Sequence, residues 1–201
     1  MNISISPEND KLKQEEEIKA RIIAAAIKRF SYFGIQKTTL AEIADDTSIP
    51  RHSLNDFFAD KGSLIKAAEE TVVKEYLDKI RQFSASDDVL SSLLGYVDVK
   101  MSFFEKYFML INQKENVHFF EWSEYINQVV VNVRKKEVDF LSNMIKSESA
   151  SPVFHAEIII NTLSAVETSF RVNNPIPSSE DFLKLNEEQK NLITVLYKGI
   201  K

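Results

Sequence analysis

Residues 21–64 read RIIAAAIKRFSYFGIQKTTLAEIADDTSIPRHSLNDFFADKGSL, and this stretch decides the fold. Ile23, Ile27 and Phe30 recur at helical spacing, and the alanines between them are strong helix formers. Gly34 follows Phe30 by four residues, which is where a left-handed glycine commonly ends a helix. The pattern therefore predicts a first helix that ends close to Gly34.

Two shorter helices are predicted next, followed by the start of a fourth. Thr39 and Glu42 form a Thr-x-x-Glu capping box, so a second helix is expected to begin near Thr39. Pro50 suits the first turn of a third helix, because its missing N–H costs nothing there. Asp60 can cap a fourth helix that begins at Lys61. Two short helices joined by a turn are typical of a helix-turn-helix, whose second helix enters the DNA major groove. Three apolar side chains are expected to face inward from the third helix: Leu54, Phe57 and Phe58.

The segment resembles the TetR family of bacterial transcriptional regulators, and the likeness covers about a quarter of the chain. The family pattern runs from an Arg and an Ile-Leu pair through Phe-x-x-x-Gly and paired Thr to an aromatic pair and a Lys before a Leu. The positions in register with it are Arg21, Ile23, Ala26, Phe30, Gly34, Thr38, Thr39, Ile43, Ala44, Ile49, Leu54, Phe57, Phe58, Lys61 and Leu64. The resemblance implies an all-α chain with an N-terminal three-helix helix-turn-helix DNA-binding domain and a larger helical ligand-binding and dimerisation domain.

Four positions depart from the family pattern. Ser48 stands where the family usually has a turn glycine, and Pro50 where it has a capping serine. His52 replaces a small residue. Asn55 replaces a tyrosine that commonly contacts a DNA phosphate, so it keeps a donor but loses reach.

The candidate DNA contacts fall into two groups. Thr38 and Thr39 can bond phosphates from the N-terminus of the second helix. The alternative is plain helix capping, and both can hold at once. The exposed start of the third helix offers side chains suited to base edges, with an ordinary solvated helix face as the alternative. The resemblance implies a phosphate contact for Lys61. The second group is Arg51, His52, Ser53 and Asn55.

The rest of the chain is patterned as helices. They are expected over 64–83, 89–111, 117–125, 129–145, 154–172 and 178–200, with strand character left open at 129–133. The expected organisation is a polar N-terminal arm (1–15), a helix-turn-helix DNA-binding domain (16–62) and a helical ligand-binding and dimerisation domain (63–201).

An aromatic cluster in this body has two interpretations. It can line a pocket for an apolar or aromatic ligand, with a few polar groups as handles, or it can be ordinary core. The resemblance implies that a pocket exists somewhere in the body. The candidate ligand-binding residues are Phe104, Tyr107, Phe108, His118, Trp122 and Tyr125.

Composition excludes several classes of protein. With no cysteine, the chain has no disulfide framework and no thiolate metal site. No catalytic motif is present, and the three histidines are isolated, so we expect no catalytic residues, no metal and no cofactor. No apolar run approaches the roughly 18 residues that a membrane-spanning helix needs, and no secretory signal is recognisable, which favours a cytoplasmic protein. The net charge of −5 does not suggest general binding to nucleic acids.

Two functions remain open. The first is a homodimeric, ligand-responsive regulator that binds a palindromic double-stranded DNA operator, most often as a repressor in this family, and is released by a small apolar or aromatic effector. The second is a helical ligand-binding or interaction protein that keeps the fold and has lost operator binding. Dimerisation is expected through the last two helices, at positions such as Leu163 and Leu196.

Overall fold

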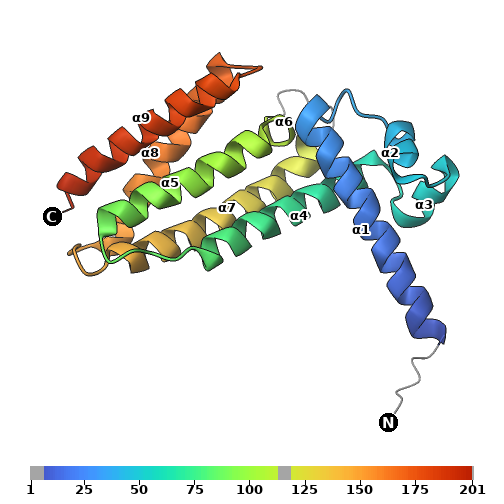
Figure 1. Ribbon diagram of the computed structural model, residues 1–201, viewed down its shortest axis with the longest axis horizontal. Helices are drawn as coiled ribbons and strands as arrows, with labels where there is room; N and C mark the ends of the chain where they lie inside the picture. Colours follow the sequence, from blue (N-terminus) through green and yellow to red (C-terminus); the bar gives the residue numbers. More distant parts are fainter. Residues whose placement is uncertain (1–6, 113–118, 201) are drawn as a thin grey trace, which may run out of the picture. The chain divides into compact units, whose positions relative to one another are not determined.

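The computed structural model describes residues 7–112 and 119–200, with side chains over 9–112 and 128–200. These residues form helices and contain no strand, which confirms the predicted all-α class. Two compact units make up the chain (Figure 1). The N-terminal unit comprises residues 1–72 and 109–113, and the C-terminal unit comprises the remainder, so the division falls inside one helix, between Val72 and Val73.

The N-terminal unit begins with α1 (Pro7–Phe33), which packs on α2 (Leu40–Thr47). A 3-10 turn, η1 (Arg51–Ser53), leads into the four-residue α3 (Leu54–Phe57). The first half of α4 (Lys61–Gln82) completes the unit. Its core consists of apolar side chains from all of these helices: Ile22, Ala26, Phe30, Ile43, Leu54, Phe58, Leu64 and Ala68.

Helix α1 starts at Pro7, whereas the sequence predicts a polar arm over residues 1–15. Proline is well suited to the first helical position. Lys11 and Glu15, and Glu15 and Lys19, are spaced by four residues, a spacing at which opposite charges support an exposed helix. The helix therefore extends about two turns further toward the N-terminus than its apolar pattern indicates.

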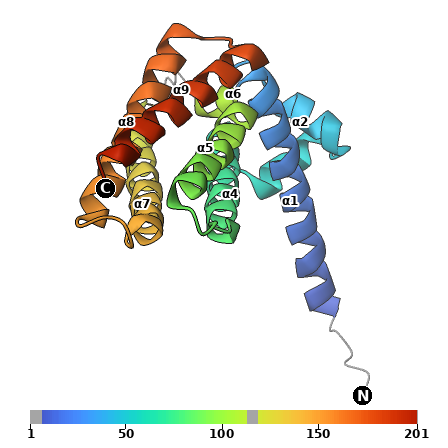
Figure 2. The ribbon, with the colours of Figure 1, turned by 60° about the vertical axis from the view of Figure 1, so that its left-hand side comes forward.

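The C-terminal unit contains the second half of α4, then α5 (Val89–Lys106), α7 (Phe119–Ile145), α8 (Pro152–Asn173) and α9 (Ser179–Lys198). The short α6 (Phe108–Ile111) follows α5, and its residues 109–111 belong to the N-terminal unit. Helix α7 packs along α8, and α9 packs along α5 (Figures 1 and 2). In both views α8 and α9 lie side by side, joined by the connection at 174–178.

Two of the predicted helix boundaries in this unit are wrong. The sequence predicts one helix over 89–111, but the chain leaves the helical conformation at Tyr107. The sequence also predicts separate helices over 117–125 and 129–145, whereas α7 is continuous from Phe119. Residues 129–133, for which the sequence leaves strand character open, are helical and belong to α7. The predicted cap of the last helix is confirmed, because Ser178 and Asp181 form a reciprocal capping box.

Candidate DNA-binding site

The turn between α1 and α2 is fixed by backbone conformation and one buried hydroxyl. Gly34 adopts φ +82°, and its N–H donates to the Phe30 carbonyl at 3.1 Å, as expected for a helix C-cap. Thr38 is only 1 % exposed, and its hydroxyl donates to the Gly34 carbonyl at 2.9 Å. The Thr38 side chain thus holds the turn together and is turned away from solvent. The alternative interpretation of Thr38, as a structural residue, is the one that this geometry favours.

Thr39 remains exposed and caps α2. Its hydroxyl accepts from the Glu42 N–H at 3.2 Å, while Glu42 accepts from the Thr39 N–H at 2.7 Å. These hydrogen bonds, together with the nearby Arg29 guanidinium, lower the pKa of Glu42. The predicted capping box is therefore present, and a phosphate contact by Thr39 would have to share the hydroxyl with Glu42.

Arg29 is a structural residue that the sequence does not reveal. Its guanidinium lies 2.6 Å from an Asp46 carboxylate oxygen and 3.2 Å from one of Glu42. Hydrogen bonding to Arg29 lowers the pKa of Asp46. Because the partners are 13 and 17 positions away, no local spacing signals these contacts. They tie α1 to both ends of α2.

The turn after α2 uses a serine in a glycine-like conformation. Ser48 has φ 55°, in the left-handed region, and the Ile49 N–H donates to the Ala44 carbonyl at 3.1 Å. The turn that the family forms with glycine is therefore formed here by Ser48. A residue with a Cβ is strained in this conformation, by about 1–2 kcal/mol.

The short helix that follows presents the candidate base contacts. Leu54 and Phe58 are buried and anchor it, so the side chains on the opposite side face solvent. Arg51, His52 and Asn55 are exposed, and Ser53 is half-buried. The Arg51 guanidinium donates to the Asn55 side-chain oxygen at 3.2 Å. The predicted group is thus gathered on one surface, with Arg51 and Asn55 in direct contact.

Lys61 lies at the start of α4 and is half-buried. Its ammonium donates to the Ile35 carbonyl at 2.6 Å, and burial lowers its pKa against the opposing effect of Glu42. The Lys61 side chain therefore links the start of α4 to the turn between α1 and α2. The sequence does not indicate this role, because the two residues are 26 positions apart.

The candidate ligand-binding residues lie in the C-terminal unit, and three of them are described with side chains. Phe104 and Phe108 are buried with ring centroids 5.5 Å apart, and both approach Phe170 of α8 and Phe182 of α9. Tyr107 is buried, and its hydroxyl donates to Glu75 at 2.5 Å. His118, and the side chains of Trp122 and Tyr125, lie outside the described residues.

The described residues contain neither a membrane-spanning helix nor a metal-binding cluster. No helix in that part of the chain is long and apolar enough to cross a membrane. No group of three or more metal-binding side chains is found over the same residues.

No family model matches the sequence, and the comparison with curated proteins finds no match. Solved structures do match. A transcriptional regulator from Cytophaga hutchinsonii has a TM-score of 0.76 and 23 % identity over 94 % of this chain and 98 % of its own. A TetR-family regulator from Pectobacterium atrosepticum has a TM-score of 0.67 and 17 % identity over 94 % and 96 %. The fold is that of TetR/AcrR-family transcriptional regulators, which confirms the resemblance.

One further match was solved with a bound molecule. The transcriptional regulator FadR from Bacillus subtilis, in complex with stearoyl-CoA, has a TM-score of 0.60 and 14 % identity, over 87 % of this chain and 96 % of its own.

Proposed function

We propose that the chain is a DNA-binding transcriptional regulator that acts as a homodimer on a palindromic operator and represses transcription until a small effector binds. The observation that carries the proposal is the exposed group Arg51, His52 and Asn55 on η1 and α3, which are anchored by Leu54 and Phe58. Arginine pairs with guanine and asparagine with adenine in the major groove, so this surface has the chemistry of sequence recognition.

The proposed effector site lies in the C-terminal unit, and the effector is a small apolar or aromatic molecule. The rings of Phe104 and Phe108 and those around them supply an apolar lining. Helix α4 belongs to both units, since residues 61–72 lie in one and 73–82 in the other. A change in its tilt is therefore the shortest covalent route from an effector to the DNA-binding surface. Effector and operator must then weaken each other's binding by the same factor.

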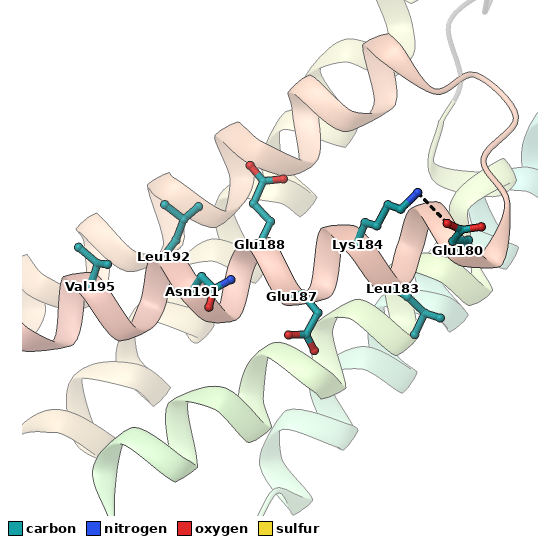
Figure 3. Close-up of a pocket in the computed structure, with 8 residues that line it drawn as sticks. All are labelled: Glu180, Leu183, Lys184, Glu187, Glu188, Asn191, Leu192 and Val195. Atoms are coloured by element: carbon teal, nitrogen blue, oxygen red, sulfur yellow. Dashed lines mark ion pairs between the residues drawn. The ribbon is translucent and has the colours of Figure 1, made fainter.

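The proposed dimer uses the outer face of α8 and α9. An open groove runs along α9, and Figure 3 shows its lining side chains following one face of that helix. Leu183 and Val195 in this groove are 66 % and 67 % exposed, an unusual position for large apolar side chains on a helix that already buries another face. Leu163, by contrast, is fully buried in its own chain, so it is a core residue and not part of the interface. The groove is lined by Glu180, Leu183, Lys184, Glu187, Glu188, Asn191, Leu192 and Val195.

A titration with DNA from beside the chain's own gene tests the proposal. We expect submicromolar binding by the dimer and a logarithm of the affinity that falls linearly with the logarithm of salt concentration. DNA of scrambled sequence is the control. Equal affinity for both DNAs would reject a sequence-specific regulator.

A second function is favoured by a specific observation. Asn55 replaces the family's phosphate-contacting tyrosine. The Lys61 ammonium donates a hydrogen bond to the Ile35 carbonyl. Both features reduce the contacts available to phosphates. The alternative is therefore a helical ligand-binding or interaction protein that has lost operator binding, and the same titration separates the two.

A further inference from the structure

The Thr39 donors at the start of α2 are already bonded to a carboxylate of the chain itself. One carboxylate oxygen of Glu42, in the first turn of α2, accepts from the Thr39 N–H at 2.7 Å and from the Thr39 hydroxyl at 2.8 Å. Thr39 is exposed, and these are the two groups through which it would bond a DNA phosphate. Both donors therefore end on an internal anion.

The second carboxylate oxygen of Glu42 is held by Arg29 of α1. The Arg29 guanidinium lies 3.2 Å from that oxygen and donates to both carboxylate oxygens of Asp46, at 2.6 and 2.9 Å. The pKa of Arg29 is raised, chiefly by its hydrogen bonding to Asp46. A Glu42 carboxylate released from Thr39 would therefore still have a cationic partner.

The charge of Glu42 also acts on Lys61, another candidate phosphate contact of the same unit. Burial lowers the pKa of the Lys61 ammonium, and the negative charge of Glu42 opposes that effect. Glu42 is itself ionised at neutral pH, because hydrogen bonds from the Thr39 N–H and hydroxyl lower its pKa. One negative charge thus acts on the Thr39 and Lys61 groups that are expected to meet DNA phosphates.

We propose that Glu42 is an internal substitute for phosphate, which occupies the Thr39 donors in the free chain and turns toward Arg29 when a DNA phosphate takes its place. A phosphate and an ionised carboxylate do not share these donors, because two anions about 4 Å apart repel each other. Rotation of the Glu42 side chain frees the N–H and the hydroxyl and keeps the contact with Arg29. The inference rests on the proposed function only in taking the start of α2 to face DNA.

This exchange weakens binding to every DNA sequence alike. Phosphate contacts carry no sequence information, so a carboxylate that competes with phosphate acts equally on operator and on other DNA. The consequence is lower occupancy of the large excess of non-specific DNA, to which a chain of net charge −5 is already weakly attracted.

Glu42→Gln tests the exchange without removing the helix cap. Glutamine also completes a capping box at this position, and its amide oxygen carries no charge to repel a phosphate. The full chain is titrated with DNA from beside its own gene and with a duplex of scrambled sequence, at several salt concentrations. We expect about five-fold tighter binding of both duplexes, the factor for one pair of unit charges 4 Å apart in water. The slope of log affinity against log salt should steepen by about 0.9.

Asp45→Asn is the matched control. Asp45 is an exposed acid on the same helix, three residues beyond Glu42, and the substitution removes the same charge. It should change the affinity by less than about two-fold, because an exposed charge outside the contact is screened by salt.

Thr39→Val distinguishes an exchange at Thr39 from a general effect of charge. Valine has the shape of threonine and lacks the hydroxyl. The substitution should weaken DNA binding roughly three-fold more in the Glu42→Gln chain than in the unaltered chain, because only in the former is the hydroxyl readily given to a phosphate.

Five results separate the possibilities. Unchanged affinity in Glu42→Gln, an equal gain in Asp45→Asn, or equal losses from Thr39→Val in both chains would overturn the inference. If the unaltered chain prefers its operator and Glu42→Gln gains nothing, the regulator stands and the exchange is rejected. If Glu42→Gln gains affinity and neither chain prefers the operator, the regulator is rejected and the exchange stands. Absence of DNA binding by Glu42→Gln at low salt would reject both.

Discussion

The Arg51 guanidinium donates to the side-chain oxygen of Asn55 at 3.2 Å, one helical turn further on. Both side chains are exposed, so the remaining N–H groups of Arg51 can reach a partner. Arginine can form two parallel hydrogen bonds with guanine. We propose that Asn55 orients Arg51 for this contact, a role that the family's tyrosine would not supply.

Substitutions at these two positions should separate recognition from positioning. Arg51→Ala is expected to weaken operator binding by about 1–3 kcal/mol and to relax the preference at one base pair. Asn55→Ala should leave the preferred sequence unchanged and lower the affinity less, because Arg51 remains but is less restricted. Affinities on a panel of single-base operator variants provide the measurement. Identical specificity profiles for Arg51→Ala and the unaltered chain would refute the base contact.

Lys61 should behave as a structural residue as much as a DNA contact. Loss of its hydrogen bond to the Ile35 carbonyl is expected to cost about 1 kcal/mol in the free energy of unfolding, since the site is only half-buried. Denaturant unfolding of Lys61→Ala measures this. Lys61→Met, which keeps the apolar stem, should recover part of the stability without recovering DNA affinity. An unchanged unfolding midpoint in Lys61→Ala would mean that the contact contributes nothing in solution.

Replacing Ser48 with glycine should stabilise the N-terminal unit. Ser48 has φ 55°, where a side chain costs about 1–2 kcal/mol, while glycine loses roughly 0.5–1 kcal/mol more backbone entropy on folding. The balance predicts a gain of about 0.5–1 kcal/mol in Ser48→Gly. Ser53→Gly is the matched control, because Ser53 has a right-handed helical conformation and should lose stability. A destabilised Ser48→Gly would show that the serine side chain contributes more than its strain costs.

Local signals predict some of the helix ends, and long-range contacts set several features that the sequence misses. Gly34, the Thr39–Glu42 box and Ser178 mark boundaries that the structure confirms, because each acts through residues within four positions. The break at Tyr107 is different. Its hydroxyl donates a hydrogen bond to Glu75, which lies 32 positions away on α4. A partner at that separation cannot be recognised from the sequence around Tyr107.

The same distinction applies to the candidate site. Exposure of Arg51, His52 and Asn55 follows from the inward spacing of Leu54 and Phe58. The roles of Thr38 and Lys61 could not be predicted in this way. Both side chains turn inward to backbone carbonyls of the α1–α2 turn, and that depends on how the helices pack.

Glu137 is a buried carboxylate that accepts hydrogen bonds from Tyr76, Tyr96 and Lys100, and it should make the stability of the C-terminal unit depend on pH. The pKa of Glu137 is lowered in the folded chain, so its contribution is present above its unfolded pKa, near 4.5, and is lost as pH falls through the folded value. Glu137→Gln should cost on the order of 3 kcal/mol at pH 7, as expected when a buried charge loses its partner. The difference from the unaltered chain should shrink below about pH 4.5. Thermal unfolding at several pH values measures it, and a difference that is constant from pH 3 to pH 7 would contradict the assignment.

The exposed apolar side chains of α9 predict an interface that two charges should break. Leu183→Glu combined with Val195→Glu places carboxylates in the groove of Figure 3, beside Glu187 and Glu188. If two copies associate through this face, the desolvated and like-charged groups should shift the chain to monomers at micromolar concentration in sedimentation. Val131→Glu is the matched control, because Val131 is also exposed but lies on α7. The monomeric variant should also lose operator binding, since the two halves of a palindrome need two linked copies about 34 Å apart. An unaltered chain that sediments as a monomer, or a double variant that remains dimeric, would place the interface elsewhere or remove it.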